Sequence, residues 1–247
     1  MTDAYPAACP TPVRLEVMRM WWRNLVFIHW PFEPSEVQAV LPPGLSVDTI
    51  DGAAWVGLVP FEMTVATPGG VTLPKVGVFP ETNVRTYVRG PDGRNGVWFS
   101  SLEAGGLAAT VTARVSYGLP YFWADMEVAS AGPYRTYRTT RRWPGPRGAT
   151  SEAAVSIGSE ILVADQSPVE RFLTARWGLY STFGSRLLYA PVSHDPWPLR
   201  TAELLHLDDE LMGAAGFRIP SEAPLVHWTA GTEVRIGRPS VVGRTDG

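Results

Sequence analysis

Hydrophobic and polar positions alternate with a period of two along most of the chain, which is typical of β-strands. The clearest case is the segment TNVRTYVRG, which the turn sequence PDGRN separates from GVWFSSLEA. Two alternating segments joined by a short turn that contains glycine predict a β-hairpin. A second hairpin is predicted where Asp51-Gly52 separates two apolar-alternating segments. Antiparallel strands are therefore the expected basis of the fold.

Helical patterns are few and short, and they occur in four segments: EPSEVQAVL, LAATVTARV, SPVERFLTA and DDELMGAAG. Ser167-Pro168 followed by Glu170 is typical of a helix start, because serine and glutamate can cap each other's backbone groups. The apolar spacing after Leu107 predicts a helix over residues 107–117. Many short strands with a few peripheral helices predict an α+β fold, mainly antiparallel β, curled into a barrel or sandwich.

No linker or internal repeat divides the chain. We therefore expect residues 1–12 to form a loose N-terminal tail, residues 13–241 a single domain, and residues 242–247 a C-terminal tail.

Composition narrows the classes of protein. Hydrophobic residues make up 45% of the chain and charged residues 18%, so it can fill a core. The net charge of −3 indicates no basic face for nucleic acid. The single cysteine, Cys9, excludes a disulfide framework within the chain. No signal peptide and no apolar segment of membrane-spanning length is visible. We expect a cytoplasmic protein with neither nucleic-acid nor membrane partners.

Motifs for cofactors and metals are missing from the sequence. It contains no Gly-x-Gly-x-x-Gly before a helix, no P-loop, no Gly-x-Ser-x-Gly and no His-Glu-x-x-His. The four histidines lack the spacing of metal ligands, so we predict no cofactor and no metal. His194 next to Asp195 is the one histidine context that hints at acid–base chemistry.

Alternation along TNVRTYVRG places Asn83, Arg85, Tyr87 and Arg89 on one face of the predicted strand. Two interpretations of this face stay open. In the first, which is the commoner case, it is the wet side of a half-exposed sheet. In the second, the sheet closes into a barrel and the face lines a polar pocket, where Arg85 is a natural clamp for a carboxylate.

The pocket interpretation also assigns roles to other polar residues. Tyr87 or Tyr121 would donate a proton, and Glu81 would act as a base or charge partner. Glu81 directly follows Phe79-Pro80, where a loop enters a strand, which is a common place for functional residues.

Four segments carry a resemblance to a known family: HWPFEPSEVQAVLPPGLSVDTIDGAAWVGLVPFEM, FPETNVRTYV, GVWFSSLEA and RVSYGLPYFWADM. Their order resembles the YqjF-like group, an uncharacterised bacterial family within the acetoacetate decarboxylase-like superfamily. The resemblance covers roughly residues 20–240. It implies an acetoacetate decarboxylase-like barrel or sandwich with an internal pocket, and it suggests a homo-oligomer.

The resemblance also implies that this chain lacks the lysine residues on which the decarboxylases of the superfamily depend. Decarboxylases of the superfamily use a Schiff-base lysine, delivered by a helix and a proline turn. Glu81 resembles their loop glutamate, but the two lysine positions here read Tyr121-Phe122. The only lysine, Lys75, has no charged neighbour in sequence that would lower its pKa. Schiff-base decarboxylation is therefore not expected.

Two functions stay open. In the first, the protein is a lysine-independent lyase, isomerase or hydratase that acts on a small carbonyl or carboxylate compound. Arg85 or Arg114 would hold an anionic group, Glu81 would move a proton, and Tyr121 would donate a hydrogen bond to an enolate. Asn83 and Tyr87 would complete the binding face. In the second, the protein binds a small ligand without catalysis. Converging polar groups with shifted pKa values would favour the enzyme.

Overall fold

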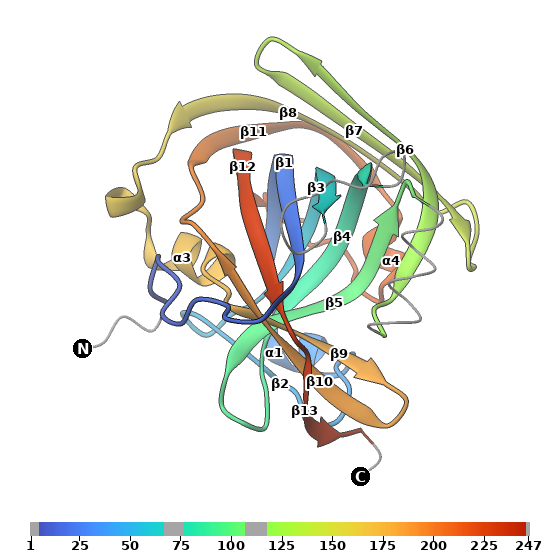
Figure 1. Cartoon of the computed structure of the whole chain (residues 1–247). Helices are drawn as coiled ribbons and strands as arrows, with labels where there is room; N and C mark the ends of the chain where they lie inside the picture. Colours follow the sequence, from blue (N-terminus) through green and yellow to red (C-terminus); the bar gives the residue numbers. More distant parts are fainter. Residues whose placement is uncertain (1–4, 67–76, 107–117, 246–247) are drawn as a thin grey trace.

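The computed structural model describes residues 5–66, 77–106 and 118–245 of the chain (Figure 1). The predicted helix over 107–117, with Arg114, lies outside the described residues, and so does Lys75.

The described residues form strands β1 Glu16–Phe32, β2 Ser46–Val47, β3 Ala54–Ala66, β4 Val78–Arg89, β5 Asn95–Ala104, β6 Tyr121–Ala131, β7 Tyr134–Trp143, β8 Thr150–Glu160, β9 Gly178–Phe183, β10 Arg186–His194, β11 Leu199–Asp209, β12 Leu225–Gly237 and β13 Ser240–Arg244. Short helices lie between them: α1 Pro34–Gln38, α3 Pro168–Thr174, α4 Leu211–Ala214 and a 3₁₀ turn at Val163–Asp165.

The strands close into a barrel. Hydrogen bonding runs from β5 through β6, β7, β8, β11, β12, β1, β3 and β4, and β4 pairs again with β5. In Figure 1, β6, β7, β8 and β11 arc around β12, β1, β3 and β4. Strands β9 and β10 make a second link between β5 and β12. Only the β5–β6 and β5–β9 pairs are parallel among the described strands, so the predicted mainly antiparallel fold is confirmed.

The local predictions have three outcomes. The hairpin around PDGRN is confirmed, because β4 and β5 pair from Arg89 and Asn95 onward. The predicted start of α3 is also confirmed, since Ser167 and Glu170 form a capping box. The second hairpin exists only as a turn at Ile50–Ala53, because β2 pairs with β4 and β3 pairs with β1 and β4.

Strands β1, β3 and β4 are buried on both faces because they lie between two hydrophobic cores. We call the first the α3-side core; it includes Leu25, Phe27, Phe61, Tyr87, Phe172 and Trp197. We call the second the α4-side core; it includes Val26, Ile28, Leu58, Val84, Tyr137 and Met212. Alternate residues of each shared strand enter opposite cores, as the pleat of a strand requires.

Residues near both ends of the described part of the chain make contacts. Tyr5, within the segment predicted as a loose tail, packs its ring edge-on against Phe172 at 5.0 Å and donates a hydrogen bond to Asp48. Toward the other end, β13 continues to Arg244 and pairs with β10, three residues into the predicted C-terminal tail.

Candidate functional site

The polar face of β4 points into the α3-side core. Glu81, Asn83, Arg85 and Tyr87 are exposed by 1%, 0%, 5% and 0%. The interpretation of this face as the wet side of a half-exposed sheet is therefore wrong for Asn83, Arg85 and Tyr87, whereas Arg89 at the end of the same face is exposed. Burial follows from the second core, because Thr82 and Val84 already occupy the other face of the strand. Four adjacent polar positions inside a protein demand a chemical explanation, since buried polar groups are costly unless they are bonded.

Glu81 and Tyr121 form a buried hydrogen-bonded pair. The Tyr121 hydroxyl donates to Oε2 of Glu81 at 2.9 Å. Burial raises the pKa of Glu81 to about 8, although the hydrogen bond from Tyr121 and the nearby Asn83 amide lower it. Burial, with the charge of Glu81, also raises the pKa of Tyr121 well above its usual range. Glu81 is therefore mostly a neutral carboxylic acid near pH 7, able to give up a proton as pH rises.

Arg85 is a buried cation without a carboxylate partner among the residues the structure describes. Its Nη2 donates to the Leu173 carbonyl of α3 and to the Tyr87 hydroxyl, both at 3.2 Å. Its Cζ lies 5.1 Å from the centre of the Phe27 ring. Its Nε makes no hydrogen bond to a described residue. A buried guanidinium held by neutral groups attracts an anion strongly, because the surroundings screen charge poorly.

His29 was not predicted as a site residue, and the structure places it against Tyr87. Its Nε2 lies 2.6 Å from the Tyr87 hydroxyl, which itself donates to the Leu173 carbonyl at 2.9 Å. Gly57 makes room for the ring, since a Cβ there would lie 2.5 Å from Nε2 of His29. Burial lowers the pKa of His29 well below its usual value, with help from the charge of Arg85.

The tautomer of His29 follows from these bonds. Because Tyr87 gives its proton to Leu173, the Nε2 of neutral His29 must donate to Tyr87. Nδ1 is then a bare acceptor, and no described residue bonds to it. Nothing in the local sequence could have identified His29, because it sits in the apolar segment LVFIHW.

Asn83 lies between Glu81 and Arg85 on the same face. Neither atom of its amide makes a hydrogen bond of normal geometry to another described residue. Asn83, Arg85 and His29 therefore bring unused donors and acceptors into the α3-side core, where more than nine in ten such groups are normally bonded. These unbonded groups make this face of β4 the candidate functional site.

A second buried carboxyl group, Glu103, lies on the opposite face of the β4–β5 hairpin. It pairs across the strands with Thr82. Arg141 binds it through Nε at 3.0 Å and also through Nη2, and Ser101 donates to it at 3.2 Å. Burial raises the pKa of Glu103 to about 7, against the lowering effect of Arg141. The negative charge of Glu103 contributes to the raised pKa of Glu81.

His194 does not form the acid–base pair that its neighbour suggested. Its Nδ1 lies 2.7 Å from the backbone carbonyl of Asp195, not from the carboxylate. The ring packs against Trp177 and Trp197, with centroids 4.5 and 5.0 Å away. Burial lowers the pKa of His194 to about 4, so this ring is neutral.

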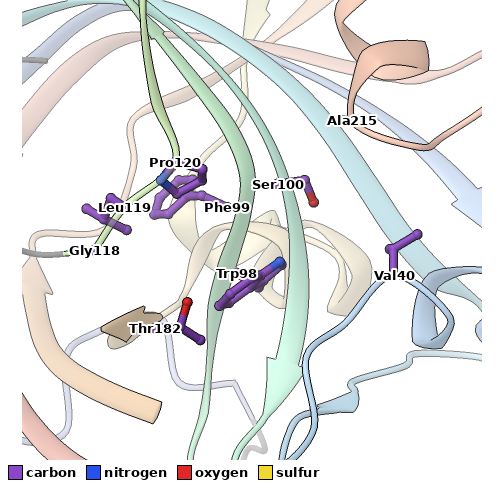
Figure 2. A pocket seen from close by; sticks show the side chains of 9 residues that line it. All are labelled: Val40, Trp98, Phe99, Ser100, Gly118, Leu119, Pro120, Thr182 and Ala215. Atoms are coloured by element: carbon purple, nitrogen blue, oxygen red, sulfur yellow. The ribbon is translucent and has the colours of Figure 1, made fainter. Parts of the chain in front are cut away.

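A surface groove of about 460 Å³ lies beside β5 (Figure 2). Its walls come from β5, β9, the segment before β6, and the residues that directly follow α1 and α4. The lining residues are mostly apolar: Val40, Trp98, Phe99, Ser100, Gly118, Leu119, Pro120, Thr182 and Ala215.

The described residues offer neither a metal-binding cluster nor a membrane-spanning helix. Across residues 5–66, 77–106 and 118–245, no three side chains of His, Cys, Asp or Glu gather in a way that could hold a metal ion. Within the same ranges, no helix is long and apolar enough to cross a membrane.

Solved structures share this barrel. Acetoacetate decarboxylase from Legionella pneumophila aligns with a TM-score of 0.69 at 15% identity, over 98% of this chain and 95% of that chain. Enduracididine biosynthesis enzyme MppR with HEPES buffer bound aligns with a TM-score of 0.64 at 17% identity, over 100% and 92%. MppR complexed with pyruvate gives 0.63 at 15%, over 94% and 93%. At such identities the likeness defines the fold alone, which is acetoacetate decarboxylase-like, as predicted.

The chain belongs to the DUF2071 family of uncharacterized conserved proteins, whose family model matches residues 19–233. Uncharacterized protein YqjF from Bacillus subtilis (strain 168) is 33% identical over 224 residues, which are 90% of this chain and 91% of that protein. The resemblance to the YqjF-like group is therefore confirmed.

Proposed function

We propose that this protein is a lysine-independent enzyme that moves a proton on a small carbonyl or carboxylate compound. The observation that carries the proposal is the buried Glu81–Tyr121 pair, which lies on the same face of β4 as the cation of Arg85. A carboxyl group with a pKa of about 8 is suited to acid–base work near neutral pH.

Arg85 would bind the anionic end of the substrate. Its charge has no carboxylate partner among the described residues, and its Nε is unbonded there. Side chains two positions apart on a strand lie about 6.6 Å apart. Asn83 therefore lies about this distance from Arg85 on one side and from Glu81 on the other. A compound of a few carbons could then place its carboxylate at Arg85 and its carbonyl oxygen at the Asn83 amide. The spacing of Glu81, Asn83 and Arg85 along β4 therefore favours a short, singly anionic substrate.

Glu81 and Tyr121 would carry out the proton transfer. Ionised Glu81 would take a proton from the carbon next to the substrate carbonyl, and the electrons of that C–H bond would form the enolate. Tyr121, whose hydroxyl donates to Glu81 in the resting protein, would turn its hydrogen bond to the enolate oxygen. Delivery of the proton from Glu81 to a different atom of the enolate would complete an isomerisation, and replacement of that proton by one from solvent before its return to the same carbon would complete an exchange. The single lysine of the chain, Lys75, has no part in this scheme.

Pyruvate is a suitable probe, because one structure with the same fold, MppR, is complexed with it. The test is exchange of the pyruvate methyl protons in D₂O, followed by NMR. We expect Glu81→Gln to slow exchange by about 100-fold or more. Exchange by the native protein should rise with pH through about 8, because only ionised Glu81 is a base. Arg85→Gln should weaken binding more than it slows the bound reaction.

The matched control is Glu127→Gln, which removes an exposed carboxylate of β6 and should leave exchange unchanged. Acetoacetate and 2-oxobutyrate extend the test beyond one compound. Exchange that is as fast in Glu81→Gln as in the native protein would overturn the role of Glu81.

The second candidate function is binding without catalysis. It is favoured by the aromatic walls of the α3-side core, where Phe27, Phe61 and Trp197 surround the polar face. Such walls with a few placed polar groups are typical of small-ligand sites. Saturable binding of the three acids, dependent on Arg85 and without proton exchange, would support this function over the enzyme.

A further inference from the structure

The surface groove lies at a gap in the pairing of β5. Strand β9 pairs with Val97 and Trp98, and β6 pairs with β5 only from Leu102 onward. Neither of these described strands pairs with residues 99–101 on that edge. The register with β4 also shifts here, because Arg85 is opposite Phe99 and Val84 is opposite Ser101. A β-bulge of this kind interrupts the ladder and leaves room beside the strand.

Phe99 lies between the groove and the α3-side core. It lines the groove, and it is also a member of the α3-side core, with only 6% of its surface exposed (Figure 2). Across the strands it is the direct neighbour of Arg85. Leu119 likewise lines the groove and packs against the same core, two residues before Tyr121. The groove therefore shares two of its lining side chains with the α3-side core, and one of them is the cross-strand neighbour of Arg85.

Where α3 packs on Tyr87, side chains cover the core. Tyr5 packs on Phe172, and the Arg176 guanidinium stacks on both rings while it binds Asp48 at 2.7 Å. Phe172 in turn packs on Tyr87, at 5.3 Å between ring centroids. A ligand approaching from this side would have to break a buried ion pair.

We infer that the groove beside β5 is the port through which a small anionic ligand reaches Arg85, and that the Phe99 side chain is its gate. The inference rests on the proposed function for the ligand's charge and size. None of the nine lining residues in the part of the chain that the structure describes is ionisable. The cation of Arg85 behind Phe99 supplies the attraction that draws the anion inward.

The experiment measures access to Arg85 without relying on any substrate. Cys9→Ser removes the only cysteine, and Val40→Cys places one thiol at an exposed position that lines the groove. A bulky maleimide on that thiol plugs the groove. Phenylglyoxal, a small reagent for arginine, then reports access to Arg85 by peptide mass spectrometry. Arg138, which is half-exposed on β7, is the internal reference.

We expect the plug to slow modification of Arg85 several-fold and to leave Arg138 unchanged. The matched control is Ser130→Cys with the same maleimide, on the exposed far end of β6, which should change neither rate. Phe99→Ala should speed modification of Arg85 several-fold; Phe99→Leu serves if the alanine variant does not fold.

Equal modification of Arg85 with and without the plug would overturn the port. So would an Arg85 that stays unmodified in all these proteins while Arg138 reacts. The tests of the port could succeed while the protein neither binds the three acids nor exchanges their protons. In that case the proposed function has failed and the port stands.

Discussion

Glu81 and Glu103 are buried carboxyl groups on neighbouring strands, and they are held in opposite ways. Glu103 faces the α4-side core with a full counter-ion, Arg141, and a hydroxyl donor, Ser101. Glu81 faces the α3-side core with a single hydroxyl donor, Tyr121, and no cation bound to it among the described residues. Burial raises both pKa values, but Glu81 reaches about 8 and Glu103 only about 7.

This difference suggests a structural role for Glu103 and a chemical role for Glu81. A buried ion pair fixes its partners in place, because breaking it leaves an isolated charge in a poor dielectric. A neutral acid with one hydrogen bond can exchange its proton at small cost. The nearby cation, Arg85, binds carbonyl and hydroxyl oxygens instead of Glu81. The charges of the α3-side core are therefore kept apart, where a ligand could lie between them.

The largest expected effect is the loss of the Glu103 counter-ion. Arg141→Met should reduce the free energy of unfolding by about 3–5 kcal/mol, because Glu103 stays buried without its partner. Urea unfolding followed by tryptophan fluorescence measures the loss. The double variant Arg141→Met with Glu103→Leu should recover most of it, since no charge is then left unpaired. A single variant as stable as the native protein would mean that Glu103 is neutral when paired.

The next effect is the contribution of Glu81 to the pH dependence of the free energy of unfolding. Its folded pKa lies above the unfolded value, so its contribution to stability is complete below about pH 4.5 and is lost as pH rises through about 8. The stability of the native protein relative to Glu81→Gln should therefore fall with pH, by about 1.4 kcal/mol per pH unit between the two pKa values. Urea midpoints at a series of pH values give this difference, and a flat difference would mean that Glu81 titrates normally.

Removing the donor to Glu81 should have a smaller effect. Tyr121→Phe deletes one buried hydroxyl, and we expect a loss of about 1 kcal/mol in unfolding free energy. Because this hydrogen bond lowers the pKa of Glu81, the variant should shift the pH profile of pyruvate exchange upward. A profile that moves downward would show that Tyr121 does not stabilise the ionised carboxylate.

The matched deletion at Glu103 should be the smallest. Ser101→Ala removes a longer hydrogen bond, 3.2 Å against 2.9 Å, from a carboxylate that keeps both bonds from Arg141. We expect a loss of about 0.5 kcal/mol in the same urea assay. No change in pyruvate exchange should accompany it, since Glu103 lies on the other face of the hairpin. A loss of pyruvate exchange in Ser101→Ala would mean that Glu103 and Glu81 act together in the reaction.

Much of the fold was readable from local patterns. The hairpin of β4 and β5 follows from alternation around PDGRN, and the start of α3 follows from Ser167 and Glu170, because both depend on residues a few positions apart. The segments that resemble the YqjF-like group also led to the correct family and barrel. Glu81 and Tyr121 were named as site residues in advance, and their hydrogen bond is a feature of the structure; their roles in catalysis stay predictions.

The sequence by itself determined which residues share a face of β4, because strand alternation is local. It did not determine that both faces are buried, since Asn83, Arg85 and Tyr87 form the same pattern as a solvated face. That was decided by the second core, which closes over Val84 from strands far along the chain. The contacts of His29 with Tyr87 and of Arg141 with Glu103 span 58 and 38 positions. Such partners come together only when the barrel closes, so the tertiary structure alone decided which buried charges are paired and which remain available to a ligand.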